Sequence, residues 1–370
     1  MKHAPDQSIY NLSIVIPTFN ERDNIYELLE RLEGQLQGLR WEVIFVDDDS
    51  PDGTSDVIRH IGSSHIKVRC IQRIGRRGLS SACVEGILSS SAPVIAVMDA
   101  DLQHDERILS EMYETLFREE LDIIVGSRYS EGGSIGSWSK QRAMISRLAG
   151  RLSRGLVPPD LKDPMSGFFM ISRPVFMECV RNLSTLGFKI LLDIFASSPR
   201  PLRFAEIPYQ FRNRYAGESK LDSQVAWDFV MLLLDKTIGH LVPVRFISFA
   251  FVGGLGLLVH MGVLSVVYLS ETATFAVAQA IASIAAIVFN FTLNNRITYR
   301  DRRLHGVHWW RGLASFFAAC AVGALANIGV AQYLFSQRQG WFVSALAGVA
   351  VAAVWNYAVT ANYTWKTSKK

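Results

Sequence analysis

The sequence predicts an α/β domain with a mostly parallel sheet, followed by an all-α domain that crosses a membrane several times. Three observations support this prediction. Between residues 10 and 128, short and nearly continuous apolar segments alternate with helical ones, which is typical of parallel strands covered on both faces. Charged residues are concentrated in the first 240 positions. From Val244 onward the chain is mostly apolar, in stretches long enough to span a bilayer.

Five strands and three helices are predicted in the α/β part. The strands are expected at LSIVIP (12–17), WEVIFVDD (41–48), IKVRCIQ (66–72), APVIAVMDAD (92–101) and LDIIVGSR (121–128). The helices are expected over 20–36, 78–90 and 106–120. In the first helix, apolar residues recur at helical spacing from Ile25 to Leu36, which indicates one buried face. Strands and helices that alternate in this way form a mostly parallel sheet.

The composition excludes several classes of protein. The four cysteines have no paired spacing, so neither a disulfide framework nor a zinc site is indicated. No Walker or GxGxxG sequence follows the first strand, which disfavours P-loop NTPases and dinucleotide dehydrogenases. The net charge of +4 is small, and its distribution indicates a membrane rather than a nucleic acid. The first residues lack an apolar segment of signal-peptide length, so we expect a cytoplasmic start.

Polar residues follow four of the predicted strands at the point where each strand ends. They read PTFNE, DDDSPDGT, DADLQH and GSR, after the first, second, fourth and fifth strands respectively. Each segment taken alone is compatible with an ordinary turn or helix cap. Ligands of open parallel sheets bind at the carboxyl ends of the strands. Four such ends on one edge therefore predict a binding site there.

The fourth strand ends in two carboxylates, Asp99 and Asp101. In an extended segment, residues two apart point to the same side, and two close carboxylates repel each other unless a cation lies between them. Together with the carboxamide of Gln103 they form an oxygen-only donor set, which suits magnesium or manganese. We interpret His104 as a neighbour of this site. The alternative is that the two aspartates are ordinary turn residues.

The motifs PTFNER, VDDDSPDGT, DADLQH, GSR and YAGESK, taken in order over residues 12–221, resemble those of family 2 glycosyltransferases with the GT-A fold, the Rossmann-like fold of nucleotide-diphospho-sugar transferases. They resemble dolichol-phosphate mannose synthases most closely. Two positions depart from the family pattern: Phe19 replaces a common Tyr, and Asp49 replaces a common Asn or Ser. Both bear on the preference for the nucleotide base.

The resemblance implies roles for individual residues. It implies donor-nucleotide contacts from Pro17, Phe19, Glu21, Val46, Asp48, Asp99, Ala100, Arg214 and Lys220. It implies metal binding by Asp99, Asp101 and Gln103, and catalytic roles for Asp101, Arg128, Arg214 and Lys220. The acceptor phosphate is expected to contact Arg128, Ser166 and Arg142.

The activity implied by the resemblance is metal-dependent transfer of a hexose to a polyprenyl or dolichyl phosphate at the cytoplasmic membrane face, with inversion. Mannose from GDP-mannose is the expected donor. A phosphate monoester has a second pKa of about 6, so the acceptor is already ionised at neutral pH and needs no general base. Asp163, in DPMSGFF, is the best candidate if a base exists, and we expect it instead to organise its loop.

Four membrane spans are predicted, over 246–269, 275–293, 313–335 and 341–363. Positive residues are concentrated in NNRITYRDRRLHGVHWWR and in the tail WKTSKK, which places both termini in the cytoplasm. We therefore expect a cytoplasmic GT-A domain over 1–220, interfacial amphipathic helices and a linker over 221–243, and a four-helix transmembrane domain over 244–370. A basic amphipathic helix is also expected over 137–156, at the bilayer surface.

The membrane part contains an internal repeat. FNFTLNNRITYR, from Phe289, aligns with WNYAVTANYTWK, from Trp355, and FVGGL (251–255) resembles AVGAL (321–325). Each copy is one helical hairpin, and the four helices resemble GtrA-like domains. Polar residues within the spans are expected to face the bundle interior. They are Asn290, Asn294, Asn327 and Asn356.

The sequence is compatible with other functions. One alternative is a polyprenyl-phosphate transferase that uses UDP-glucose or another UDP-sugar. Another is a membrane glycolipid scaffold or flippase with an inactive soluble domain, which the intact motifs at every strand end disfavour. A processive polysaccharide synthase is disfavoured because the chain has no QxxRW segment. The sequence is compatible with a homo-oligomer, and it does not indicate the length of the lipid.

Overall fold

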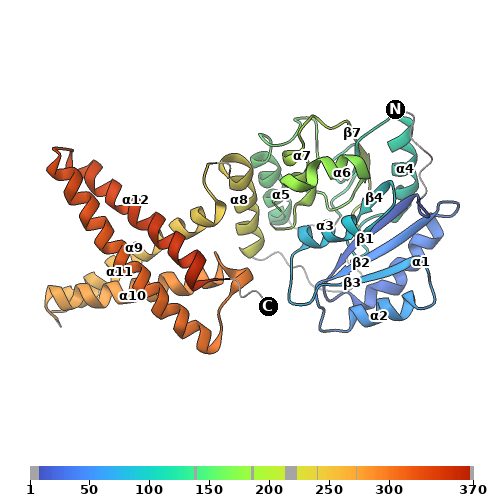
Figure 1. Ribbon diagram of the computed structural model, residues 1–370. Coiled ribbons are helices and arrows are strands. Elements are labelled where there is room, and N and C mark those ends of the chain that lie inside the picture. The colour runs from blue at the N-terminus through green and yellow to red at the C-terminus, as the bar shows by residue number, and fades with distance from the viewer. Residues whose placement is uncertain are drawn as a thin grey trace. The chain divides into compact units, whose positions relative to one another are not determined.

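The computed structural model describes residues 8–136, 140–184, 187–212, 223–239, 241–271 and 273–366. The chain divides into two compact units, Met1–Ile238 and Gly239–Lys370 (Figure 1). The first unit contains the α/β fold, and the second is helical. All four cysteines are free thiols.

The first unit is built on a seven-stranded sheet in the order β3-β2-β1-β4-β6-β5-β7. Its strands are β1 Leu12–Thr18, β2 Trp41–Asp47, β3 Val68–Gln72, β4 Val94–Val97, β5 Ile123–Ser127, β6 Phe169–Ser172 and β7 Phe204–Pro208. Only β6 is antiparallel to its neighbours, β4 and β5. The five predicted strands and the mostly parallel sheet are confirmed. The structure adds β6 and β7, which were not predicted.

Helices cover both faces of this sheet. They are α1 Ile25–Gln35, α2 Thr54–Gly62, α3 Leu79–Ser89, α4 Leu109–Arg118, α5 Lys140–Leu152, α6 Arg173–Cys179, α7 Ile190–Ser197 and α8 Ser223–Ile238. Alternate residues of β1 belong to opposite cores: Ile14 lies in the core that includes residues of α1, α2 and α4, whereas Val15 lies in the core that includes residues of α3, α6 and α7. This alternation explains why β1 is apolar throughout.

Three helices of the first unit, α2, α6 and α7, were not predicted. The first of them follows a segment with turn residues. The segment SPDGT, interpreted as a turn, leads directly into α2, and Gly53 precedes that helix with φ of 85°. This left-handed conformation is readily adopted only by glycine. The segment SPDGT therefore has the residues of a turn and also begins a helix.

The two helices expected at the membrane surface are both present. Along α5, Met144, Leu148 and Leu152 lie four residues apart and are exposed, so this helix presents an apolar stripe outward. The helix α8 packs on α7 through buried Leu232 and through Lys236, whose Nζ lies 2.7 Å from Asp193 Oδ1. Contact of either helix with a bilayer stays a prediction.

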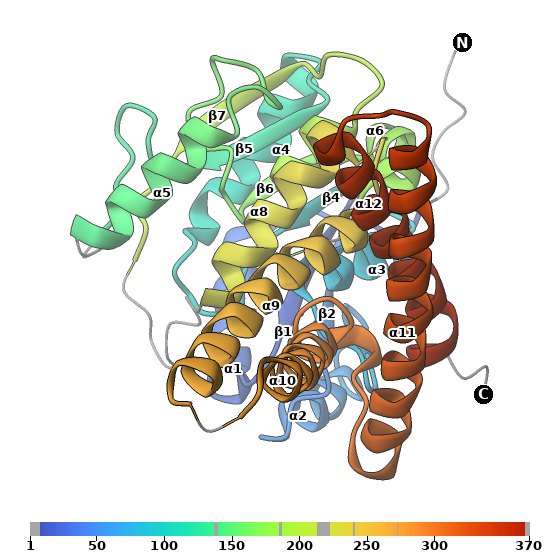
Figure 2. The same ribbon diagram turned by 90° about the vertical axis from the view of Figure 1, so that its left-hand side faces the viewer.

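The second unit consists of two helical hairpins. They are formed by α9 Val244–Leu269 with α10 Phe275–Arg296, and by α11 Gly306–Ser336 with α12 Trp341–Val359 (Figure 2). Within the described part of the chain, the helices of 244–269, 277–296 and 306–336 are long and apolar enough to cross a membrane. The fourth span, over α12, stays a prediction.

Equivalent contacts occur in the two hairpins. Ser248 bonds to Thr298 in the first hairpin, and Ser315 bonds to Thr364 in the second, each at 2.9 Å. The amide of Tyr299 donates to Asn294 O and that of Trp365 to Thr360 O, so both hairpins end in the same widened helical turn. The rings of Tyr299 and Trp365 stack on each other at 4.1 Å.

Each hairpin also seats an asparagine on a glycine of the facing helix. A Cβ on Gly256 would lie 2.1 Å from Asn290 Oδ1, and one on Gly323 would lie 2.3 Å from Asn356 Oδ1. Small residues of this kind allow polar side chains to pack between membrane helices. By contact, Gly256 is thus the counterpart of Gly323. The alignment of FVGGL with AVGAL had paired Gly253 with Gly323, one helical turn away.

We predict that Gly256→Leu destabilises the membrane unit, because the new side chain overlaps Asn290. Overpacking of this kind costs about 1–3 kcal/mol. The measurement is the thermal unfolding temperature of the purified protein in detergent. Gly254→Leu is the matched control, because a Cβ at Gly254 meets nothing within 4 Å. Equal unfolding temperatures for the two variants would contradict this packing.

Candidate active site

Three neighbouring strands end in backbone turns of the same unusual kind. Asn20 and Asp49 follow the ends of β1 and β2 closely, and Leu102 lies in the turn after β4, with φ of 58°, 59° and 61° respectively. These strands are adjacent and parallel, so their ends lie on one edge of the sheet. Non-glycine residues are uncommon in this conformation and cluster at functional sites. We therefore place the candidate site at this edge.

The turn after β4 presents the predicted metal ligands. Gln103 N donates to Asp101 Oδ1 at 3.2 Å, which closes a tight turn around left-handed Leu102. The Asp99 side chain is 37% exposed, whereas Asp101 and Gln103 are buried. A Cβ on Gly167 would lie 3.3 Å from Asp99 Oδ2, so the bare glycine backbone leaves room beside this carboxylate.

The residues of this turn fit a hard divalent cation. Among the described residues, no group of three His, Cys, Asp or Glu side chains is placed to hold a metal ion. A cation held by Asp99 and Asp101 would therefore need a further ligand of another kind. Gln103 Nε2 donates to Arg212 O at 3.0 Å, which makes the amide oxygen the atom that can face an ion. Two carboxylates and one amide oxygen suit Mg²⁺ or Mn²⁺.

His104 supports the turn from inside. Its ring is 2% exposed and stacks on Phe168, with the centroids 5.1 Å apart. Burial lowers the pKa of His104 to about 4, although the charge of Asp101 acts in the opposite direction. The neutral ring accepts a hydrogen bond from Asp99 N at Nδ1, at 3.0 Å. His104 therefore holds the backbone of Asp99, a more specific role than the neighbour predicted from the sequence.

Tyr209 is a buried residue of the site that sequence reasoning missed. It lies just after β7, is 2% exposed and packs edge-on against His104 and Phe168. Its hydroxyl has no hydrogen-bond partner within the part of the chain that the structure describes. Burial raises the pKa of Tyr209 above its usual range, and Asp99 and Asp101 act in the same direction. No signal in the sequence marked Tyr209, because β7 itself was not predicted.

Arg128, at the end of β5, forms a buried ion pair with Asp163. Arg128 Nε donates to Asp163 Oδ2 and Nη2 donates to Oδ1, both at 2.8 Å, and the Arg128 amide also donates to Oδ2. Burial alone would lower the pKa of Arg128, but its hydrogen bonds to Asp163 raise it, so the guanidinium stays charged. Both oxygens of Asp163 serve Arg128, as expected of a residue that organises its loop.

The predicted acceptor contacts beside Arg128 are placed only in part. Ser166 is buried, and its hydroxyl donates to Gly126 O at 2.7 Å. The helix that contains Arg142 is described, but the Arg142 side chain is not. Arg214 and Lys220 lie in 213–222, outside the described residues.

The predicted nucleotide contacts lie at the tips of β1 and β2. Asp48 Oδ1 lies 2.5 Å from Nη1 of buried Arg73, and Asp48 Oδ2 accepts from Gly78 N at 2.7 Å. Burial raises the pKa of Asp48 against the opposing effects of Gly78 and Arg73. The guanidinium of Arg77 lies 4.3 Å from the centroid of the Phe19 ring. Neither Arg73 nor Arg77 was predicted from the sequence.

The remaining nucleotide candidates differ in what they can offer. The side chains of Val46 and Ala100 are buried, so contacts from these two residues would have to come from the main chain. Pro17 is paired with Val46 in the sheet register and is half-buried. Glu21 accepts a hydrogen bond from Asn24 Nδ2 at 2.7 Å. Of the site residues predicted from the sequence and placed by the structure, most thus lie on the β1, β2, β4 and β5 ends of one edge.

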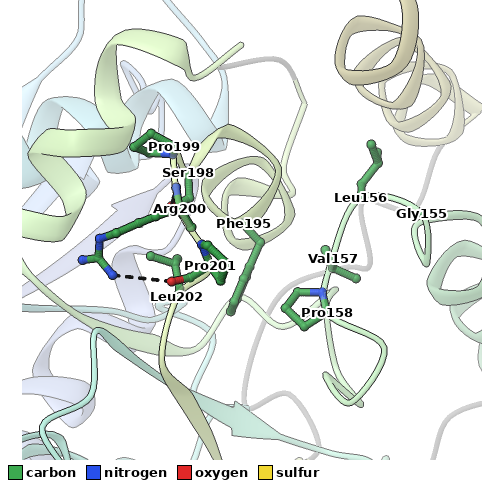
Figure 3. Close-up of a pocket in the computed structure, with 10 residues that line it drawn as sticks. All are labelled: Gly155, Leu156, Val157, Pro158, Phe195, Ser198, Pro199, Arg200, Pro201 and Leu202. Carbon is green, nitrogen blue, oxygen red and sulfur yellow. Dashed lines mark hydrogen bonds between the residues drawn. The ribbon is translucent and has the colours of Figure 1, made fainter.

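A separate cavity of about 410 Å³ lies elsewhere in the first unit. Figure 3 shows its lining, formed mainly by Leu156, Val157, Pro158, Phe195 and Leu202. Leu202 lies just before the amino end of β7, whereas the candidate site lies at the carboxyl ends of the strands. The cavity therefore lies toward the opposite ends of the strands. The lining of the cavity includes the charged residue Arg200, which is paired with Asp122 at 2.8 Å.

Comparison with known proteins agrees with the resemblance. Residues 13–180 match the profile of glycosyl transferase family 2, and residues 248–365 match the GtrA/DPMS transmembrane domain. A dolichol-phosphate mannosyltransferase of Pyrococcus furiosus is 35% identical over 361 residues, which cover 96% of this chain and 99% of that protein. A dolichol-phosphate mannosyltransferase of Saccharomyces cerevisiae is 34% identical over 60% of this chain and 85% of its own length.

Among solved structures, glucosyl-3-phosphoglycerate synthase of Mycobacterium tuberculosis is similar at 15% identity with a TM-score of 0.48, over 64% of this chain and 84% of that one.

The similarity to the Pyrococcus furiosus protein extends through both units. Family membership thus applies to the whole chain, as a membrane glycosyltransferase of the GT-A fold. The chain belongs to the family 2 glycosyltransferases with a GtrA/DPMS transmembrane domain, the family that includes the dolichol-phosphate mannosyltransferases.

Proposed function

We propose that this glycosyltransferase transfers mannose from GDP-mannose to a polyprenyl phosphate, such as dolichyl phosphate, at the cytoplasmic face of a membrane. The observation that carries the proposal is the pairing, on one sheet edge, of the Asp99–Asp101 turn with the buried Arg128–Asp163 pair. The first suits the diphosphate of a donor with its cation, and the second suits an anionic acceptor. The relatives named dolichol-phosphate mannosyltransferase support mannose and the lipid phosphate.

Asp99, Asp101 and Gln103 are proposed to hold a Mg²⁺ or Mn²⁺ ion. When bound, such an ion supplies Lewis-acid neutralisation of the departing diphosphate. The chain's own contribution is orientation. His104 holds the main chain of Asp99, and the Gln103 amide closes the turn on Asp101. Arg214 and Lys220 are proposed to add positive charge near the same phosphates, where charge develops during transfer.

The acceptor phosphate is proposed to lie near Arg128. The bidentate contact with Asp163 fixes the plane of the Arg128 guanidinium and keeps its charge in a buried place. An ionised phosphate oxygen can attack the anomeric carbon directly, so no residue need remove a proton. A single displacement of this kind inverts the anomeric configuration. Asp163 thus acts through Arg128 rather than as a base.

The membrane unit is proposed to bring the enzyme to its lipid acceptor, with both chain termini in the cytoplasm. Its long apolar helices and the basic loop between α10 and α11 support this orientation. The exposed apolar stripe of α5 provides a further surface for the bilayer. Both features would keep the soluble unit on the side where nucleotide sugars are made.

The first test is a transfer assay. Membranes that contain the protein are incubated with radiolabelled GDP-mannose or UDP-glucose, with and without Mn²⁺, and the lipid fraction is extracted. We expect label in lipid from GDP-mannose only, dependent on the metal. Asp101→Asn should lower transfer about 100-fold or more, since it removes a charge that stabilises the reacting diphosphate complex. Asp56→Asn, at a side chain that is 80% exposed, is the control.

Transfer from UDP-glucose instead would refute the proposed donor. Label in lipid without any divalent cation, or full activity in Asp101→Asn, would refute the proposed ion site.

A second test addresses Asp163. Asp163→Asn removes the charged partner of buried Arg128, so the free energy of unfolding should fall by about 3–5 kcal/mol, measured by chemical denaturation. Arg128→Met, Asp163→Asn and the double variant should lose transfer to a similar extent, because the two residues act as one unit. Asp160→Asn, at an exposed position, controls for the loss of a carboxylate. Losses that multiply in the double variant would indicate an independent role, such as a base.

A further inference from the structure

A segment from beyond β7 returns to the turn after β4 at Arg212. The Arg212 amide donates to Gln103 O, and Arg212 O accepts from Gln103 Nε2, both at 3.0 Å. The main chain of one residue therefore holds both the backbone and the carboxamide of Gln103. These two residues are 109 positions apart in the sequence.

The side chain of Arg212 is itself tied down by two acids. Nη1 donates to Glu106 Oε2 and Nη2 donates to Asp105 Oδ1, each at 2.8 Å. The two carboxylates are only 5–6% exposed, so leaving either without a cation would be costly. A fork of two charge-assisted bonds specifies position as well as charge.

The two acids belong to a rigid part of the fold. Asp105 caps the short 3-10 turn Glu106–Ile108, which leads into α4. The helix α4 is anchored in the core by Leu109 and Met112. The side chain of Arg212 is thus bonded to residues that lead into a packed helix, and its main chain is bonded to Gln103. Neither Arg212 nor these acids has a role in the function proposed above.

We infer that Arg212 is a positioning residue of the transfer reaction: its fork to Asp105 and Glu106 holds its main chain where it orients the Gln103 carboxamide oxygen toward the divalent cation. This inference rests on the proposed ion site. Residues that orient metal ligands commonly change metal affinity 10–100-fold when they are replaced, although they do not touch the ion.

Simple electrostatics predicts the opposite change in affinity for the divalent cation. Arg212 is a cation close to an ion site, so its removal should strengthen the binding of a divalent cation if charge alone mattered. Arg107 provides the matched comparison. It binds the same carboxylate, with Nε and Nη2 donating to Asp105 at 2.8 and 2.6 Å, but it is 61% exposed and has no contact with Gln103 among its described bonds.

The experiment measures Mn²⁺ affinity by titration calorimetry on the full-length protein in detergent, with GDP present. At a temperature where the variant is fully folded, Arg212→Met should weaken Mn²⁺ binding about 10-fold or more. The variant should also unfold at a lower temperature than the wild type, because Glu106 loses its cation. Arg107→Met should leave affinity within about twofold or raise it slightly. In transfer assays, the KM for Mn²⁺ of Arg212→Met should rise more than kcat falls. Glu106→Gln, which keeps an acceptor oxygen, should restore most of the affinity lost in Glu106→Ala.

Unchanged or tighter Mn²⁺ binding in Arg212→Met would overturn the inference. If Arg212→Met does not fold, Arg212→Lys replaces it: this variant keeps the charge but loses the fork, and wild-type affinity would again overturn the inference. Asp101→Asn separates the two proposals. If it abolishes Mn²⁺ binding while Arg212→Met does not alter it, the ion site stands and the role of Arg212 falls. If the wild type binds no Mn²⁺, both fall.

Discussion

The structure depends on one electrostatic constraint: a parallel sheet brings its acidic strand ends to a single edge, where most of their charges are buried. A buried carboxylate is costly unless a cation or hydrogen bonds compensate its charge. Three guanidinium groups meet this need at separate places, Arg73 beside Asp48, Arg128 beside Asp163 and Arg212 between Asp105 and Glu106. The Asp99 side chain, in contrast, is 37% exposed. The edge therefore combines buried carboxylates that have guanidinium partners with an acidic side chain that reaches the solvent.

The antiparallel strand β6 is what completes this edge. It enters the sheet between β4 and β5, and the residues just before it bring Gly167 against Asp99 and Phe168 against His104. The segment after β7 then adds Tyr209 and Arg212 from a remote part of the chain. An aromatic wall thus forms behind the acidic turn and keeps His104 neutral. The acidic residues of the turn are close together in the sequence, but the residues that support the turn come from distant segments.

The membrane unit meets a different constraint, because polar groups within apolar helices have few partners. Its two hairpins meet it with the same devices: a serine–threonine bond, a widened last turn, and an asparagine seated on a glycine. The stacked rings of Tyr299 and Trp365 join the two copies at equivalent positions. The two hairpins therefore share these contacts and, for the serine–threonine and asparagine–glycine pairs, also the residue types that make them.

The sequence by itself determined the features that depend on near neighbours. Strand alternation, the stripe of α1, the long apolar helices and the acidic turn after β4 are patterns within a few residues, so five strands and the oxygen-rich donor set could be predicted. Only the tertiary structure decided which groups pair across the chain. The partner of Asp48 is Arg73, that of Gln103 is Arg212, and the glycine beneath Asn290 is Gly256 rather than Gly253. Such pairings form only when distant segments of the chain come together in the fold. A periodic pattern of neighbouring residues does not indicate which segments meet.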